Sequence, residues 1–329
     1  MSSKSRLVKR VLIYFITSLI IISITSLALS NFNYQVLMYL SRINVIYIII
    51  SIVVFVLLTV LNTLKLIIIF KKFNYTLKFV EVLELLFAQT FASLITPGLY
   101  TGGEVITLSY LVLNKNLNVH YVVRALIIKY SIDTLTLMII TIALTLLLNM
   151  VIPILFILVV PYIGVSILFL SNTFSKFLSK LLSRVSSRSL KLRSFLKSRG
   201  VSINFNQDIA IPRSTYLKTL LNITVISITH WLVYGIFFLL SLNTVGFTQS
   251  YAHGLLFACM YTVLTTVPIT PGSAGIGEVI NYYIASMIGI RDMYLVFNTI
   301  FRLYTYFIPL ALSSIFFAHV VKKIVRILW

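Results

Sequence analysis

The sequence predicts an all-α polytopic membrane protein, with about six transmembrane helices and two re-entrant helical hairpins arranged as an inverted repeat. Of its 329 residues, 59% are hydrophobic and only 10% are charged, whereas an average globular domain is about 45–50% apolar and about 25% charged. Apolar runs of about 20 residues, the length that spans a bilayer, follow one another along the chain. A motif that begins with TPG and ends with GE occurs twice, and each copy interrupts an apolar stretch.

The uninterrupted apolar runs give six full spans, which we expect at 11–29, 43–70, 121–150, 151–171, 216–242 and 293–320. A cluster of basic residues precedes the first run, which is the charge order of either a retained helix or a cleaved signal peptide. We favour a retained helix because the run is longer than the roughly 7–15 apolar residues of a signal peptide.

The two interrupted stretches, 79–114 and 251–289, are each predicted to enter and leave the membrane on one side. In each, an apolar half-helix ends at Thr-Pro-Gly, and a second half-helix begins near a glutamate. Proline cannot continue the first helix, glycine permits the turn, and a glutamate is favourable near the N-terminus of the next helix. Neither half is long enough to cross a bilayer easily.

The positions of the basic residues support this topology. The chain has 27 Lys and Arg against 7 Asp and Glu, a formal net charge of +20. Six spans and two hairpins place 24 of these 27 residues on the cytoplasmic side, in agreement with the positive-inside rule. We therefore expect a multi-pass protein of the cell membrane with both termini in the cytoplasm. The charge is assigned to topology and to anionic lipid headgroups at the cytoplasmic face, and no nucleic-acid partner is expected.

The two motifs define a repeat within a single transmembrane domain, 1–329. They share five of nine residues at a constant offset of 174 positions. Repeat 1 is about 43–150 with its hairpin at 79–114, and repeat 2 is about 216–320 with its hairpin at 251–289. The charge distribution gives them opposite orientations, and inverted repeats with interrupted helices are typical of transporters, whose site lies where the breaks meet. The alternative, two ordinary helices kinked by Pro and Gly, would violate the charge rule.

Three acidic residues fall in predicted membrane segments, where an unpaired charge is costly and a functional role is the first hypothesis. Glu104 and Glu278 could bind a cationic headgroup, carry protons, or pair with a cation for which a lipid phosphate competes. Capping of the half-helices is an alternative role, and it is compatible with the others. Asp133 lies four residues after Lys129, so an intrahelical ion pair is expected there. The remaining candidates for substrate binding or translocation are the turn residues and two further cations: Thr96, Gly98, Gly102, Gly103, Thr270, Gly272, Gly275, Gly277, Arg124 and Arg302.

The segment 172–213 is predicted to form a basic amphipathic helix on the cytoplasmic side. Apolar residues recur at helical spacing between Phe174 and Val185, and basic residues populate another face. Such a helix lies in the headgroup plane and favours anionic lipid, although a helix that only fixes topology is an equal alternative. The four histidines and the single cysteine show no metal-ligand spacing, and no nucleotide-binding or hydrolase motif is present. We expect no metal, no cofactor and no enzymatic activity.

The two motifs with their following residues, TPGLYTGGEVITLSYLV and VPITPGSAGIGEVINYYIASMIGI, resemble the signatures of the transmembrane region of lysylphosphatidylglycerol synthases, also described as the flippase-like domain family. The similarity extends less specifically over 45–321. Ser273 and Ala274 depart from the second signature, in which a further glycine is common. The resemblance implies a membrane domain that moves a lipid headgroup between leaflets, or one that accompanies a glycosyltransferase. Because the soluble synthase domain of the family is absent from this sequence, lipid synthesis is not implied.

The leading hypothesis is a lipid flippase or scramblase-like transporter, in which Glu104 and Glu278 meet a phospholipid or polyprenyl-linked headgroup near the middle of the membrane. One alternative is a membrane partner that transports nothing and anchors a glycosyltransferase or lipid-modifying enzyme. Ion-coupled uptake of a small solute is a third possibility. The expected protein partner is such an enzyme or a second copy of the chain.

Overall fold

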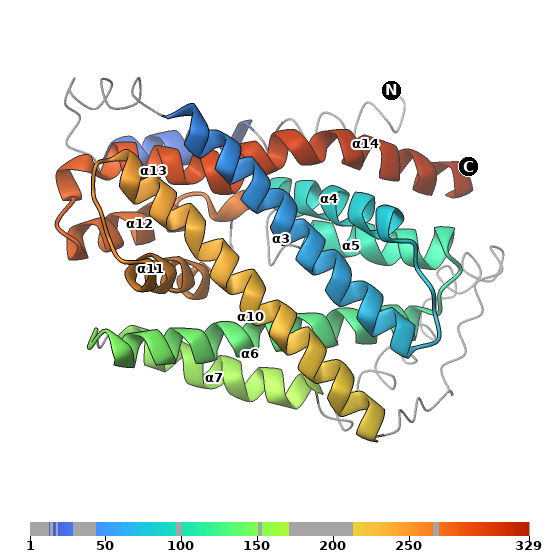
Figure 1. Ribbon diagram of the computed structural model, residues 1–329. Helices are drawn as coiled ribbons and strands as arrows, with labels where there is room; N and C mark the ends of the chain where they lie inside the picture. Colours follow the sequence, from blue (N-terminus) through green and yellow to red (C-terminus); the bar gives the residue numbers. More distant parts are fainter. Residues whose placement is uncertain are drawn as a thin grey trace.

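The protein is a helical bundle in its computed structural model (Figure 1). The structure describes residues 13, 16–17, 19–28, 44–96, 101–150, 153–170, 213–265 and 270–328. Within these residues all regular secondary structure is helical. The predicted amphipathic segment 172–213 lies outside the described residues except at its last position.

The first half of the chain contains α3 (Val45–Lys72), α4 (Phe79–Ile95), α5 (Thr101–Ser109), α6 (Val119–Leu147) and α7 (Pro153–Leu170). The second half contains α10 (Arg213–Thr244), α11 (Tyr251–Leu264), α12 (Ile276–Met287), α13 (Tyr294–Arg302) and α14 (Ile308–Leu328). Short π-helical segments extend α5 (Tyr110–Asn114) and join α13 to α14 (Leu303–Phe307). Single 3₁₀ turns precede α12 (Pro271–Ser273) and α13 (Arg291–Met293). A further apolar helix covers Leu19–Ala28.

Polar residues between the apolar runs determine where three of the helices begin. The side chain of Asn44 accepts a hydrogen bond of 2.9 Å from the N–H of Ile46 at the start of α3. Asn118 accepts a hydrogen bond of the same length from the N–H of His120 at the start of α6. Ser250 caps α11 in the same way. Each cap satisfies a backbone donor that has no partner within the helix.

Among the described residues, four helices are long and apolar enough to cross a membrane, namely Val45–Lys72, Val119–Leu147, Leu217–Thr244 and Arg291–Ile327. They correspond to four of the six predicted spans. The helix α7 occupies most of a fifth, and Leu19–Ala28 lies within the first. The prediction of an all-helical, multi-pass membrane protein is therefore confirmed.

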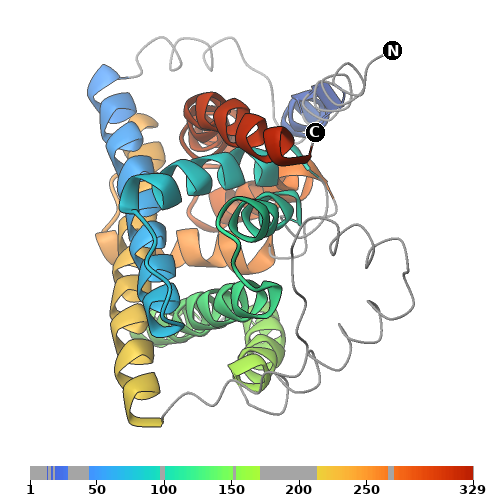
Figure 2. The same cartoon turned by 90° about the vertical axis from the view of Figure 1, so that its right-hand side faces the viewer.

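Two pairs of shorter helices lie at opposite ends of the bundle. The pair α4 and α5 lies at the right of Figure 1, and the pair α11 and α12 lies at the left. Seen from the right-hand side, α4 and α5 are near the viewer and α11 and α12 lie behind them (Figure 2). The helices α6 and α13–α14 run along the bundle, and α3 and α10 cross it obliquely and pack on each other. Each TPG motif therefore belongs to the connection between two short helices, and the two pairs of helices lie at opposite ends of the bundle.

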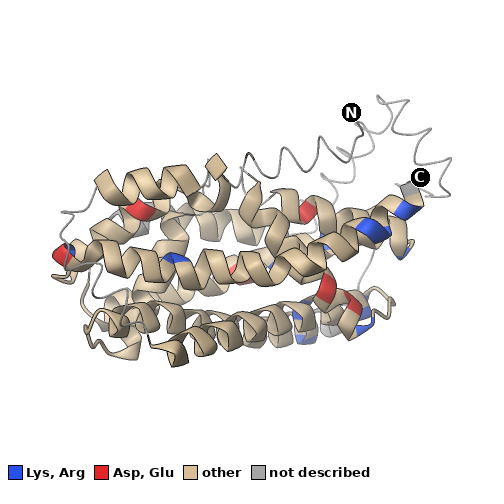
Figure 3. Cartoon of the chain, turned by 90° about the horizontal axis from the view of Figure 1, so that it is seen from above, with Lys and Arg blue, Asp and Glu red and all other residues tan. Residues whose placement is uncertain are grey.

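The outer surface is largely apolar, and the charges gather mainly at one end. Many large apolar side chains are exposed, among them Ile46, Leu147 and Ile315, as expected for a surface that faces lipid. Among the described residues, Lys and Arg are concentrated at the end where α14 finishes (Figure 3). At the same end, Glu81 and Glu84 near the start of α4 form ion pairs with basic residues, at 2.6 Å to Lys115 and 3.0 Å to Lys323.

Candidate functional site

The first TPG motif holds α4 and α5 in close contact through two glycines. A Cβ atom on Gly103 would lie 2.7 Å from the carbonyl oxygen of Gln89 and would overlap the Ser93 hydroxyl. A Cβ atom on Gly102 would overlap the side chain of Thr96. Small residues allow helices in a membrane to approach closely. The two glycines therefore fix the position of Glu104, the next residue along α5.

Close packing at Gly103 leads to a test of this helix contact. We expect Gly103→Ala to cost about 1–3 kcal/mol of stability, because the added methyl overpacks a backbone contact. Gly164→Ala in α7 is the matched control, since nothing lies within 4 Å of a Cβ atom there. Thermal unfolding in detergent measures both variants. Equal unfolding temperatures for the two would contradict the predicted contact between α4 and α5.

Glu104 receives hydrogen bonds at one of its two carboxylate oxygens. Its Oε1 accepts from Nε2 of Gln89 on α4 at 2.8 Å and from the hydroxyl of Tyr130 on α6. Its Oε2 is buried and has no hydrogen-bond partner among the described residues. No described Lys, Arg or His lies within salt-bridge distance of the carboxylate.

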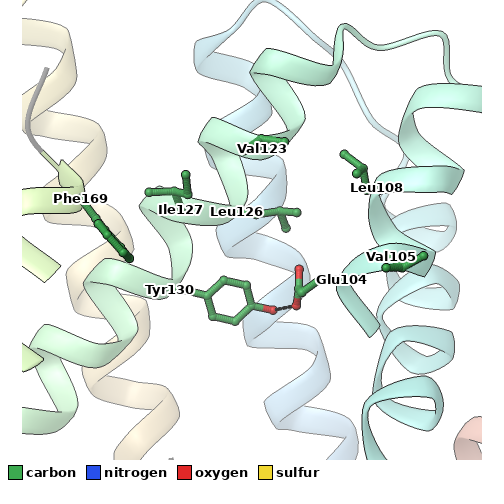
Figure 4. A pocket seen from close by; sticks show the side chains of 8 residues that line it. All are labelled: Glu104, Val105, Leu108, Val123, Leu126, Ile127, Tyr130 and Phe169. Atoms are coloured by element: carbon green, nitrogen blue, oxygen red, sulfur yellow. Dashed lines mark hydrogen bonds between the residues drawn. The ribbon is translucent and has the colours of Figure 1, made fainter. Parts of the chain in front are cut away.

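Glu104 forms part of the wall of a pocket of about 380 Å³ between α5, α6 and α7 (Figure 4). Apart from Glu104 and Tyr130, the lining is apolar: Val105, Leu108, Val123, Leu126, Ile127 and Phe169. Val105 is 59% exposed, and Tyr130 and Phe169 are each 37% exposed. The pocket therefore lies at the lipid-facing surface, and its volume is within the range that holds small ligands.

Beyond Tyr130, a cluster of buried charges joins α3, α6 and α10. Asp133 pairs with Nζ of Lys65 at 2.6 Å and more distantly, at 3.7 Å, with Nζ of Lys129. It also accepts a hydrogen bond from the Ser227 hydroxyl at 2.5 Å. The Lys129 ammonium lies 4.0 Å from the centroid of the Tyr130 ring, within cation–π distance. Tyr130 thus connects this cluster to Glu104.

The second TPG motif is closed by an ion pair. Arg302, at the end of α13, donates from Nε to Oε1 of Glu278 at 2.5 Å. Its other nitrogens donate to the carbonyl oxygens of Gly272 at 2.9 Å and Ser273 at 3.1 Å. The second oxygen of Glu278 accepts from the N–H of Gly275 at 2.6 Å, at the start of α12. Glu278 is 0% exposed and Arg302 is 2% exposed, so the pair is enclosed by protein.

The glycines of the second motif allow this closure. Gly272 and Gly275 have φ of +57° and +89°, in the region that disfavours side chains. A Cβ atom on Gly277 would lie 2.6 Å from the hydroxyl of Tyr261 and would overlap Arg302. Thr270 donates to the carbonyl of Ala274 at 2.5 Å and tightens the turn.

The breaks in the two interrupted stretches meet in one buried cluster. Ile95, the last residue of α4, and Ala274, inside the second turn, pack in it with Ile22, Tyr306 and Leu310. Ile22 belongs to the helix Leu19–Ala28, in which Ser26 also accepts a hydrogen bond of 3.0 Å from Asn298. The helix Leu19–Ala28 is thus packed into the bundle beside the second motif.

The structure separates residues that the sequence grouped as one site. Glu104 lines the lipid-facing pocket, whereas Glu278 is enclosed with Arg302. Arg302, a possible partner of either glutamate, pairs with Glu278. Arg124 is partly exposed on α6, nine residues before Asp133. Gly98 lies outside the described residues.

Sequence reasoning also misplaced one charge and missed two polar groups. Lys65 is one of the 24 basic residues that the predicted topology assigns to the cytoplasmic side, but its side chain is 0% exposed and pairs with Asp133. Gln89 and Tyr130 were not selected because neither carries a charge. The sequence signal for this pair was Lys65 itself, a lysine seven residues before the end of an apolar helix. A charge buried inside a membrane protein requires a counter-ion.

The fold and these sites define a multi-pass helical membrane protein with buried charges and a pocket at its lipid-facing surface. The chain belongs to the family described as the lysylphosphatidylglycerol synthase TM region, which matches residues 4–313. This confirms the resemblance inferred from the two motifs. No curated protein and no solved structure matches the chain significantly.

Proposed function

We propose that the protein is a lipid flippase or scramblase-like transporter, which moves a phospholipid or polyprenyl-linked headgroup between the leaflets along the face formed by α5, α6 and α7. The observation that carries the proposal is Glu104, which lies in the wall of an apolar pocket at the lipid-facing surface and whose buried Oε2 has no described hydrogen-bond partner. A polar headgroup needs hydrogen-bonding partners to cross the hydrocarbon region. Glu104 offers an acceptor there, and the apolar walls suit an acyl chain.

The arrangement of the helices supports transport rather than simple anchoring. The short pairs α4–α5 and α11–α12 lie at opposite ends of the bundle, and residues beside the breaks between their helices share a buried cluster. This is the arrangement that two re-entrant hairpins in an inverted repeat would give, and such repeats underlie alternating access in many transporters. In this proposal the basic end of the bundle is cytoplasmic, with both termini on that side, and attracts anionic headgroups.

The two glutamates have different roles in this proposal. Glu278 and Arg302 stabilise the second turn, because they pair with each other and form hydrogen bonds with its backbone. Glu104 is the residue that meets the lipid. The headgroup would approach it past Val105 and Tyr130, which are exposed at the pocket.

Glu104→Gln tests the proposal with little change in shape. Glutamine keeps a hydrogen-bonding group at the same place but cannot carry a negative charge. We expect translocation of fluorescent phospholipids in proteoliposomes to fall about tenfold, a loss of about 1.4 kcal/mol of transition-state stabilisation. The readout is the fraction of probe that membrane-impermeant dithionite reduces with time.

Glu81→Gln is the matched control, because Glu81 is a carboxylate in the first turn of α4 that pairs with Lys115. Its translocation rate should equal that of the wild type. Both variants must retain the wild-type unfolding temperature for the comparison to hold. Unchanged translocation by a folded Glu104→Gln protein would refute the role of Glu104.

A further inference from the structure

The carboxyl group of Glu104 is suited to exist both with and without a proton. Both of its described hydrogen-bond donors, Gln89 and Tyr130, act on Oε1. An oxygen in that position accepts hydrogen bonds whether the group is ionised or protonated. The buried Oε2 has no described partner and is therefore available for a proton.

None of the described groups that contact Glu104 forms an ion pair with its carboxylate, and none of them carries a negative charge. From α4 it meets Gln89, which is uncharged, and from α7 the pocket receives Phe169. From α6 it meets Tyr130, with Lys129 lying over the ring of that tyrosine. Lys129 is thus separated from Glu104 by one tyrosine ring and attracts it without a direct ion pair.

The proton on Glu104 sets the net charge of the buried cluster. Lys65 and Lys129 supply two positive charges, and Asp133 and ionised Glu104 supply two negative charges, with the neighbouring buried imidazole of His230 counted as neutral. The cluster is neutral in that state. When Glu104 is protonated, the cluster carries one excess positive charge beside an apolar pocket, and an excess charge inside a membrane protein requires a counter-ion.

We propose that Glu104 takes up and releases one proton in each transport cycle, and that its protonated state accompanies a lipid with a singly charged phosphate diester headgroup. This inference rests on the proposed function and specifies its energy source and substrate class. The phosphate balances the charge that protonation leaves uncompensated around Lys129. Proton and lipid then move together without net charge transfer.

The step is balanced in atoms and charge. A proton from water forms an O–H bond at Oε2 and removes one negative charge from the cluster. The incoming phosphate diester replaces that charge. On the other side of the membrane the O–H bond breaks, the proton returns to water, and the restored carboxylate displaces the phosphate.

The test uses purified protein in vesicles that contain a fluorescent phosphatidylglycerol as the anionic probe and a fluorescent phosphatidylcholine as the zwitterionic probe. A difference of about one pH unit across the membrane corresponds to a tenfold ratio of proton activities. For one proton per lipid, we expect the anionic probe to approach about a tenfold excess in the leaflet on the alkaline side. The excess should disappear when a protonophore is added.

Two variants and the second lipid complete the experiment. Glu104→Gln should give no leaflet excess at any pH gradient, and Glu81→Gln should behave as the wild type. Infrared difference spectra should show a carboxylic-acid C=O band that appears on acidification of the wild type and is missing from Glu104→Gln. Equal accumulation of the zwitterionic probe would overturn the assignment of a headgroup with a net negative charge.

The outcomes distinguish this inference from the proposed function. Translocation by the wild type that is insensitive to the pH gradient and to the protonophore overturns the proton linkage and leaves lipid transport standing. The absence of the infrared band overturns it as well. Failure of the wild type to move either probe, in a folded state, overturns the proposed function and this inference with it.

Discussion

Asp133→Leu is expected to destabilise the protein by about 3–5 kcal/mol, since breaking a buried ion pair leaves an uncompensated charge. Lys65 is 0% exposed and Lys129 is 4% exposed, and both pair with this carboxylate. Removing it therefore leaves two buried ammonium groups without a counter-ion. The measurement is the unfolding temperature and the fraction of monodisperse protein in detergent.

Lys65→Met is the informative companion of that variant. Asp133 keeps Lys129 and the Ser227 hydroxyl when Lys65 is removed, so we expect a smaller loss than with Asp133→Leu. The double variant should lie between them, because one buried cation, Lys129, still lacks its partner. A loss for Lys65→Met that equals or exceeds the loss for Asp133→Leu would contradict the arrangement of charges in this cluster.

Arg302→Met is the second substitution with a large expected effect, again about 3–5 kcal/mol. It leaves Glu278 buried without a cation and removes the donors that Gly272 and Ser273 accept from. Arg291→Met is the matched control, because Arg291 is exposed and lies over the ring of Tyr282. Such a surface change usually alters stability by within about 0.5 kcal/mol.

Combining Arg302→Met with Glu278→Gln separates the charge from the hydrogen bonds. Neutralising the second partner removes the uncompensated charge, so the double variant should recover part of the lost stability. Full recovery is not expected, because two buried carbonyl oxygens still lose their donor. A double variant less stable than Arg302→Met alone would show that the ion pair is not the main support of this turn.

Local sequence pattern predicted much of the helical framework for physical reasons. The apolar runs located the four long helices because a bilayer imposes their length. The Thr-Pro-Gly motifs located the breaks after α4 and α11, since proline lacks a backbone donor and glycine adopts positive φ, as Gly272 does. For Glu278 the sequence predicted a possible capping role, and its hydrogen bond from the N–H of Gly275 is such a cap. The sequence did not predict that its side chain is fully enclosed.

Partners distant in the sequence could not be predicted in this way. Lys65 meets Asp133 across 68 positions, and Gln89 and Tyr130 meet Glu104 from two other helices. A hydropathy pattern gives the length of a helix but not which helix packs beside it. The pocket depends on such packing, since its walls come from α5, α6 and α7.

The most direct measurement of the central claim is lipid translocation by the purified protein alone, in vesicles that contain no other protein. We predict that the wild type moves a fluorescent phosphatidylglycerol between leaflets and that Glu104→Gln moves it about tenfold more slowly. A folded wild-type protein that moves no lipid, but that co-purifies with a glycosyltransferase or a lipid-modifying enzyme, would contradict transport and identify the chain as a membrane partner of that enzyme.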